Sequence, residues 1–134
     1  MPKSSTRTEG DQVKICISAS TGNLDSQVDP RFGRCPYFVI VDSETMEFEA
    51  IPNRAAGATG GAGIQAAQTV ANKGARVVVT GNIGPNAFQA LSNLGIKIVV
   101  GASGNIRKAV EAYKKGELNE AKTSTVRSHF GTNT

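Results

Sequence analysis

Three stretches in the first half of the chain have the hydrophobic pattern of β-strands. VKICIS, residues 13–18, alternates apolar with polar or small residues, and YFVIVD, residues 37–42, is a short apolar run. MEFEAIPN, residues 46–53, alternates again. Because residues 43–45 can turn the chain, we expect the second and third strands to pair as a hairpin.

The second half of the chain switches between helical and strand patterns. Apolar residues recur at helical spacing in residues 62–73, in a segment that starts at Pro85, and in residues 102–116. Between these segments lie the β-branched runs ARVVVTG and IKIVVG, which are typical of buried strands. The predicted order is β-β-β-α-β-α-β-α, and strand–helix–strand units require parallel, right-handed crossovers. We therefore predict an α/β fold with a mixed five-stranded sheet flanked by helices.

Both ends of the chain lack this periodicity. Residues 1–12 and 121–134 are polar, and we expect them to be flexible tails around one domain at residues 13–120. A chain of 134 residues is long enough for a single hydrophobic core. Hydrophobic residues make up 39% and charged residues 19%, as in soluble globular proteins.

The charge pattern argues against two classes of partner. The net charge is +4, but the Lys and Arg residues are scattered, and no series of aromatic residues accompanies them as in a nucleic-acid-binding face. No apolar stretch approaches the roughly 20 residues that span a bilayer. The N-terminus also lacks the apolar core of a secretory signal. We therefore expect a cytoplasmic protein that binds neither nucleic acid nor membranes.

Glycine-bearing segments precede the three predicted helices, at residues 57–63, 80–86 and 101–105. In an open α/β sheet, the loops at the carboxyl ends of parallel strands gather at one edge, where ligands bind. N–H groups at helix starts attract anions, and glycine lets the backbone approach them closely. Each segment alone is explained by a turn of the chain, whereas the three together leave two interpretations open: an anion-binding edge, or three structural turns. None has the GK[ST] ending or the GxGxxG pattern of nucleotide-binding loops.

The loop DPRFGRCP, residues 29–36, carries more chemistry than a connection requires. Arg31 and Arg34 supply fixed positive charge, and Gly33 allows a turn. We expect the arginines to lower the pKa of Cys35, which is then a candidate ligand for a soft metal, although a small loop residue without a role is the simpler explanation. We predict that this loop lies beside the glycine segments and forms one wall of a binding site.

Other candidate residues have simple structural explanations. His129 is the only histidine and lies in a stretch without a predicted element, where a solvated side chain is the simpler interpretation. Asp25, Asp29 and Asp42 could gather around a divalent metal, but turns commonly contain aspartate. Cys16 alternates away from the apolar face of its strand, and packing under a helix would account for it.

Three segments together resemble the dinitrogenase iron–molybdenum cofactor biosynthesis family over residues 13–120. They are DPRFGRCPYFVIVD, GAGIQAAQTVANKGARVVVTGNIGPNAFQALSNLGIKIVVG and NIRKAVEAYKKGEL. The resemblance implies a ribonuclease H-like fold. It also implies a metal-cluster cargo, because members from nitrogen fixation carry iron–sulfur precursors of the iron–molybdenum cofactor between assembly proteins. A related protein of sulfate reducers holds a molybdenum–copper–sulfide cluster.

The resemblance implies cluster-binding residues in three stretches that match the family pattern: RFGR, the glycine-rich loop and TGN-x-GPNAF. They are Arg31, Arg34, Gly60, Gly61, Gly63, Thr80, Gly81, Asn82 and Gly84. A histidine near the C-terminus is a proposed cluster ligand in some members, so His129 joins Cys35 as a candidate metal ligand.

We predict a non-enzymatic binder or carrier of an iron–sulfur or molybdenum–iron–sulfur cluster, acting as a monomer or weak dimer. Cluster-assembly or acceptor proteins are the implied partners. Two alternatives stay open: a metal-independent module that binds a small anion or a protein, and a metal-dependent nuclease. A nuclease would need clustered carboxylates, and Asp42 lacks evident partners on facing strands.

Overall fold

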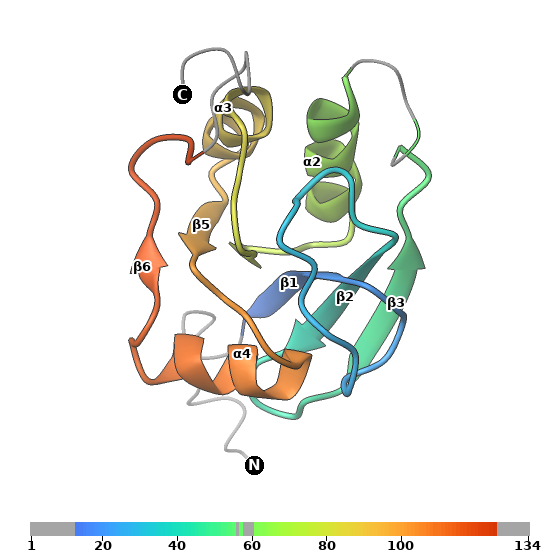
Figure 1. The fold of residues 1–134 in the computed structure, drawn as a ribbon, viewed down its shortest axis with the longest axis vertical. Helices are drawn as coiled ribbons and strands as arrows, with labels where there is room; N and C mark the ends of the chain where they lie inside the picture. The colour runs from blue at the N-terminus through green and yellow to red at the C-terminus, as the bar shows by residue number, and fades with distance from the viewer. Residues whose placement is uncertain (1–12, 56, 58–60, 126–134) are drawn as a thin grey trace.

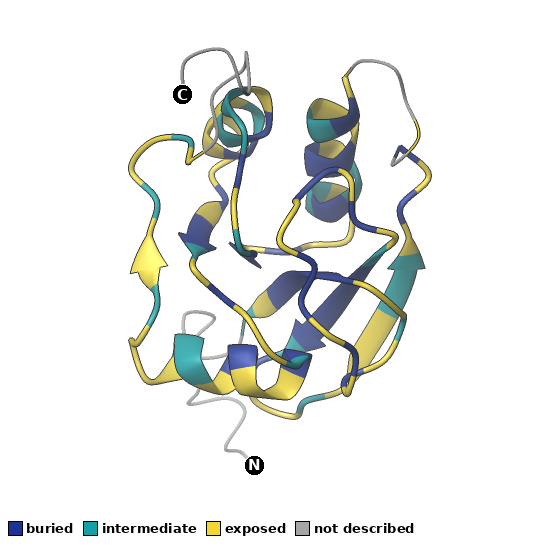
Figure 2. Ribbon diagram, in the orientation of Figure 1, coloured by how far each residue is buried: buried dark blue, intermediate teal, exposed yellow. Residues whose placement is uncertain are grey.

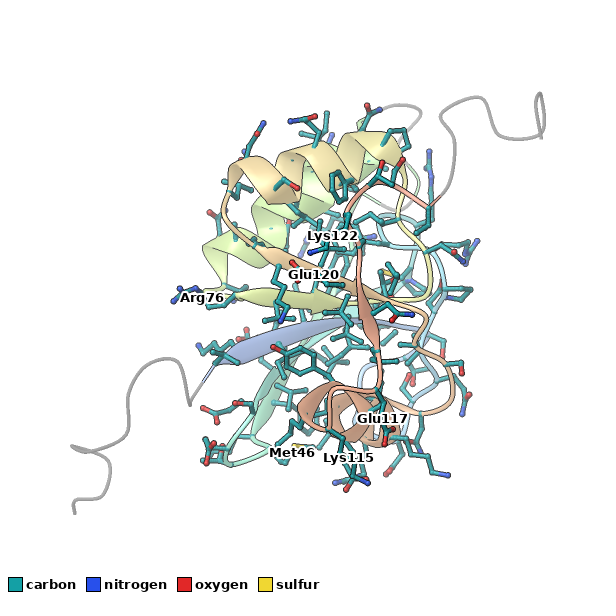
Figure 3. The ribbon with its side chains drawn as sticks, turned by 90° about the vertical axis from the view of Figure 1, so that its left-hand side faces the viewer. Met46, Arg76, Lys115, Glu117, Glu120 and Lys122 are labelled. Carbon is teal, nitrogen blue, oxygen red and sulfur yellow. The ribbon has the colours of Figure 1, made fainter. Side chains whose placement is uncertain are left out.

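The computed structural model describes residues 13–55, 57 and 61–125, which form three layers. Figures 1 and 3 show a sheet with two helices on one face and one helix on the other. The strands are β1 (Lys14–Ala19), β2 (Tyr37–Asp42), β3 (Phe48–Pro52), β4 (Val77–Val79), β5 (Lys97–Val100) and β6 (Asn119–Glu120). The helices are α2 (Ala62–Asn72), α3 (Pro85–Asn93) and α4 (Ile106–Lys114).

The strand order is β3-β2-β1-β4-β5-β6. β2 is antiparallel to both of its neighbours, β1 and β3, whereas β4 is parallel to β1 and to β5. In register, Cys16 lies opposite Ile40 on one side and Val78 on the other. Because two antiparallel steps restore the direction, β3 runs the same way as β1, β4 and β5. The carboxyl ends of these four strands therefore lie at one edge of the sheet.

The prediction of five strands is wrong, because β6 adds a sixth strand antiparallel to β5. Its two residues are exposed, so no apolar alternation could reveal it. Backbone pairing places it, and Ala121 N–H next to it donates to Ile98 O at 2.8 Å. Figure 3 labels Glu120 and Lys122 along this edge. The mixed α/β sheet with helices on both faces is confirmed, and the ribonuclease H-like assignment stays a prediction.

Two apolar clusters hold the layers together. Alternation along β1 divides them: Cys16 faces α2 and α3, whereas Ile15 and Ile17 face α4. Every residue of β1 after Lys14 is buried, as Figure 2 shows for the central strands. The prediction that Cys16 packs under a helix is confirmed.

No helix among the described residues has the length and apolar character needed to cross a membrane.

Candidate functional site

The carboxyl edge of the sheet is where all three described helices begin. α2 follows β3, α3 follows β4 and α4 follows β5, and these three strands run in the same direction. Residues 61–63, the last part of the first glycine segment, thus lie at the same edge as the other two segments, although α2 follows a hairpin strand. α2 and α3 also lie side by side on one face (Figure 1). The edge therefore presents two neighbouring helix N-termini on that face.

At the N-terminus of α4, other groups of the protein accept hydrogen bonds from the backbone N–H groups. The Asn105 side-chain oxygen accepts a hydrogen bond from Lys108 N–H at 2.9 Å, which is an N-cap. The loop that precedes Asp29 crosses this end, and Ser26 O accepts a hydrogen bond from Ile106 N–H at 2.9 Å. The third glycine segment, 101–105, therefore belongs to a capped helix start and not to an anion site.

The N-termini of α2 and α3 have no side-chain cap. The N-cap of α2 is Gly61, with φ at +74°, and that of α3 is Gly84, followed by Pro85 at the first helical position. The first-turn N–H groups of a helix lack intrahelical acceptors and carry partial positive charge. No acidic residue occupies the first turn of either helix. Both ends are therefore suited to an anion.

The loop at residues 29–36, which we call the arginine loop, lies against both of these helix starts. A Cβ added at Gly33, where φ is +97°, would lie 3.2 Å from Gly63 Cα. A Cβ at Gly81 would lie 2.8 Å from Pro30 Cα, and Asn82 N–H donates to Pro30 O at 2.8 Å. Residues 29–34, 61–63 and 81–84 thus form one continuous surface, which we call the glycine–arginine rim.

Arg31 is an exposed cation of the rim. Its side chain is 64% exposed, yet Nε and Nη2 donate to the two carboxylate oxygens of Asp29, both at 3.1 Å. The hydrogen bonds and the negative charge of Asp29 raise the pKa of the Arg31 guanidinium. Arg34 is also exposed, and its backbone N–H donates to Arg31 O at 3.2 Å. Arg31 is therefore both fixed in place and accessible to solvent.

The other residues selected from the sequence have different placements. Asn82 is exposed, but Thr80 is fully buried, and its hydroxyl lies 2.7 Å from the Ser18 hydroxyl. Thr80 therefore joins β4 to β1 and does not present its side chain to a ligand. Gly60 and His129 lie outside the described residues.

Cys35 faces the core. It is fully buried in the cluster with Phe32 and Phe38, and burial raises the pKa of its thiol to about 12. The prediction that the neighbouring arginines lower this pKa is wrong, because desolvation of the thiolate dominates. Burial likewise raises the pKa of Cys16. Metal ligation requires a thiolate, which this environment disfavours at both positions.

Both thiols should therefore resist alkylation in the folded protein. At about pH 8 each stays protonated and inaccessible, whereas an unfolded cysteine has a pKa of about 8.5. We expect iodoacetamide to label neither thiol in native buffer and both in concentrated guanidinium, as counted by intact mass spectrometry. Rapid labelling of Cys35 in the native protein would contradict its placement in the core.

The three aspartates of the nuclease hypothesis do not meet. Asp25 pairs with Arg107 at 3.0 Å, and Asp29 pairs with Arg31. Asp42 lies opposite Lys14, at the other end of the sheet from Asp29. Among the residues that the structure describes, no group of three or more His, Cys, Asp or Glu side chains is arranged to hold a metal ion.

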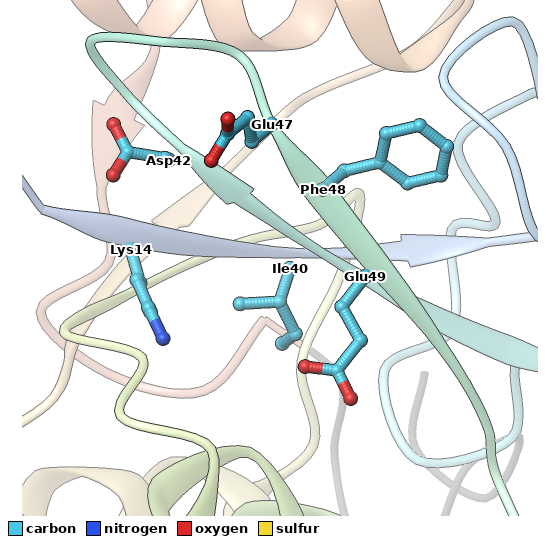
Figure 4. Close-up of a pocket in the computed structure, with 6 residues that line it drawn as sticks. All are labelled: Lys14, Ile40, Asp42, Glu47, Phe48 and Glu49. Carbon is cyan, nitrogen blue, oxygen red and sulfur yellow. The ribbon is translucent and has the colours of Figure 1, made fainter.

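A small hollow of about 170 Å³ lies at the far edge of the sheet from the glycine–arginine rim. In Figure 4, Lys14 extends from β1, Asp42 from the end of β2 and Glu49 from β3, and Glu47 lies just before β3. Glu49 already pairs with Lys73 at 2.8 Å. The hollow is lined by Lys14, Ile40, Asp42, Glu47, Phe48 and Glu49. It is separate from the candidate site.

Asn53 is a rim-supporting residue that the sequence analysis missed. It is buried, and its Nδ2 donates to Gly33 O at 3.0 Å and to Cys35 O at 2.8 Å. Its Oδ1 accepts from Ala55 N–H at 3.1 Å. This amide ties the end of β3 to the arginine loop. The sequence offers no signal for it, because Asn after a strand is common in turns.

Comparison with known proteins places this chain in a family. The model of the family described as dinitrogenase iron–molybdenum cofactor matches residues 13–116. The apo form of the orange protein from Desulfovibrio gigas is 43% identical, with a TM-score of 0.81 over 84% of this chain and 95% of that one. A NifB-like protein from Thermotoga is 33% identical, with a TM-score of 0.75 over 84% and 97%.

A dinitrogenase-like protein from Methanocaldococcus jannaschii shares the fold, at 18% identity and a TM-score of 0.61, over 84% of this chain and 97% of that one. No curated protein matches the chain. The family model covers more than half of the residues, and the orange protein is similar along almost its whole length. The chain therefore belongs to the dinitrogenase iron–molybdenum cofactor family.

Proposed function

We propose that this protein binds and carries an anionic metal–sulfur cluster, iron–sulfur or molybdenum–iron–sulfur, at the glycine–arginine rim. The observation that carries the proposal is the meeting of two uncapped helix N-termini with the exposed Arg31 on one surface. Membership of the dinitrogenase iron–molybdenum cofactor family supports a cluster as the anion. Cluster-assembly and acceptor proteins are the partners that such a carrier requires.

The chemistry of the rim suits a cargo that must be released. Backbone N–H groups and a guanidinium hold anions through hydrogen bonds and charge, without a covalent bond to the metal. The two cysteines face the core, so within the described residues the rim offers no thiolate that would bind the cluster tightly. We therefore propose retention by many weak donors, which allows transfer to an acceptor.

Anaerobic reconstitution tests this function. The protein is incubated with iron, sulfide and molybdate, passed through a desalting column, and analysed for metal and visible absorption. We expect cluster retention by the wild-type chain and a loss of about tenfold or more in Arg31→Gln, because a charged hydrogen bond contributes about 1.5–3 kcal/mol.

The matched control is Arg107→Gln. Arg107 is also an exposed arginine with one carboxylate partner at 3.0 Å, but that partner is Asp25 and the pair lies at the α4 end. We expect this variant to retain the cluster like the wild type. Equal losses in both variants would point to net charge and argue against a specific rim site.

A metal-independent anion-binding module remains the second candidate, because the same donors suit any small anion. Metal analysis of the protein purified anaerobically from its native host separates the two. Stoichiometric metal with sulfide supports the carrier, and a metal-free protein with a bound organic or inorganic anion supports the module.

A further inference from the structure

The Asp29 carboxylate is a buried charge whose described partner is an exposed arginine. Its side chain is only 7% exposed, whereas that of Arg31 is 64% exposed. Arg31 donates three hydrogen bonds to it: from the backbone N–H at 2.9 Å, from Nε at 3.1 Å and from Nη2 at 3.1 Å. Pairing of this kind offsets the cost of burying a carboxylate. The arrangement therefore fixes the orientation of the guanidinium.

Asp29 is itself anchored to the sheet. Its backbone N–H donates to Ser18 O at 2.8 Å, and its backbone O accepts from the Ser18 hydroxyl at 2.6 Å. The Ser18 hydroxyl also lies 2.7 Å from that of Thr80, which joins the ends of β1 and β4. The orientation of Arg31 is thus transmitted from the central strands through a chain of buried polar groups.

The pairing leaves part of the guanidinium available. A guanidinium has five N–H donors, and Asp29 engages one on Nε and one on Nη2. Neither Nη1 donor is engaged by Asp29. We propose that Asp29 is a positioning residue, which holds the Nε–Nη2 side of Arg31 so that the remaining donors meet the anion bound at the glycine–arginine rim. This inference rests on the proposed function.

Positioning and simple electrostatics predict opposite results for Asp29→Asn. Removal of a negative charge beside the rim would by itself tighten the binding of an anion. Loss of the carboxylate fork would instead release the guanidinium, and binding would then have to immobilise a flexible side chain. The sign of the change in affinity therefore distinguishes the two effects.

The experiment is a double-mutant cycle on cluster retention after reconstitution with iron, sulfide and molybdate. We expect Asp29→Asn to weaken retention about two- to tenfold in the wild-type chain. In the Arg31→Gln background we expect the same substitution to cause no loss, because no guanidinium remains to be positioned. Tighter binding by Asp29→Asn, or an equal loss in both backgrounds, would overturn the proposal.

Two controls separate positioning from a general loss of structure. Ser18→Ala removes one of the two hydrogen bonds that anchor the Asp29 backbone but leaves the carboxylate fork, so we expect a smaller loss than in Asp29→Asn. Asp25→Asn removes the same charge from an exposed pair, and we expect no loss. A loss in Ser18→Ala as large as that in Asp29→Asn would assign the effect to loop stability and overturn the proposal.

Arg31→Lys keeps the buried residues intact and so remains informative if Asp29→Asn fails to fold. Lysine keeps the charge but lacks the planar fork, so positioning predicts a loss similar to that of Arg31→Gln. Full retention by Arg31→Lys would overturn the proposal.

A titration with inorganic sulfate, followed by NMR at the Arg31 Nε–H signal, separates the proposed cluster function from the positioning role of Asp29. If sulfate shifts this signal in the wild type and binds more weakly to Asp29→Asn, while no cluster is retained, the positioning role stands and the cluster function fails. If the cluster is retained but Asp29→Asn causes the same loss of retention in the wild-type and Arg31→Gln backgrounds, the cluster function stands and the positioning role fails.

Discussion

Gly81→Ala is expected to destabilise the protein by about 1–3 kcal/mol and to displace the arginine loop from the glycine segment at residues 81–84. The added Cβ would lie 2.8 Å from Pro30 Cα and 2.9 Å from Pro30 Cβ, closer than real Cβ atoms approach their neighbours. One of the two segments must therefore move. The hydrogen bond from Asn82 N–H to Pro30 O, now 2.8 Å, holds both segments at this distance. Urea unfolding followed by circular dichroism measures the loss of stability.

Gly84→Ala is the matched control, because it adds the same methyl group to the same segment. Nothing lies within 4 Å of a Cβ at Gly84, and its φ of −83° and ψ of 172° are accessible to alanine. We expect no more than about 0.5 kcal/mol of change. If the two substitutions destabilise the protein equally, the close packing of Pro30 on Gly81 is not the cause.

Asn53→Asp is expected to cost about 3–5 kcal/mol at neutral pH, the typical cost of an uncompensated buried charge. The Asn53 amide donates to Gly33 O and Cys35 O at 3.0 and 2.8 Å. A carboxylate in the same place turns two hydrogen bonds into contacts between a negative charge and two carbonyl oxygens. The arginine loop would lose its attachment to β3, and the measurement is again urea unfolding.

The pH dependence of the stability of Asn53→Asp provides a second test. Burial beside two carbonyl oxygens raises the folded-state pKa of the introduced carboxyl above its unfolded value of about 3.9. The penalty therefore grows as the pH rises through and above about 4, and it shrinks in acid, where the group is protonated in both states. Asn23→Asp is the control: Asn23 is exposed and accepts a hydrogen bond from Asp25 N–H at 2.9 Å, a role that aspartate keeps. Equal penalties at acid and neutral pH for Asn53→Asp would contradict this account of the Asn53 amide.

The strands and helices that could be predicted are those in which burial of one face produces a regular spacing of apolar residues along the sequence. Alternation in residues 13–18 identified β1, and the spacing of apolar residues identified α2, α3 and α4. The gathering of the glycine segments at one edge also followed from the sequence, because parallel strands bring their carboxyl ends together. The placement of the arginine loop beside them was predicted from its charged and turn-forming residues, which a simple connection does not require, and not from periodicity.

The features that could not be predicted depend on individual tertiary contacts, which leave no periodic pattern in the sequence. β6 pairs with β5 through its backbone, and its two residues are exposed. Cys35 turns into the core beside Phe32 and Phe38, although the local sequence suggested a polar loop. The capping of α4 by Asn105 and by the loop that crosses it removed one of three apparent anion sites. In each case a tertiary contact overrides what neighbouring residues suggest.

The most direct test of the rim as the cluster site is an anaerobic NMR comparison of backbone amide signals before and after loading with iron, sulfide and molybdate. We expect shifts or broadening at Gly61, Gly63, Gly84 and Arg31, because these residues form the two uncapped helix starts and the arginine wall. The capped start of α4, at residues 105–108, should stay unchanged and serves as an internal control. Changes at α4 with an unaltered rim, or no changes anywhere despite bound metal, would contradict the assignment.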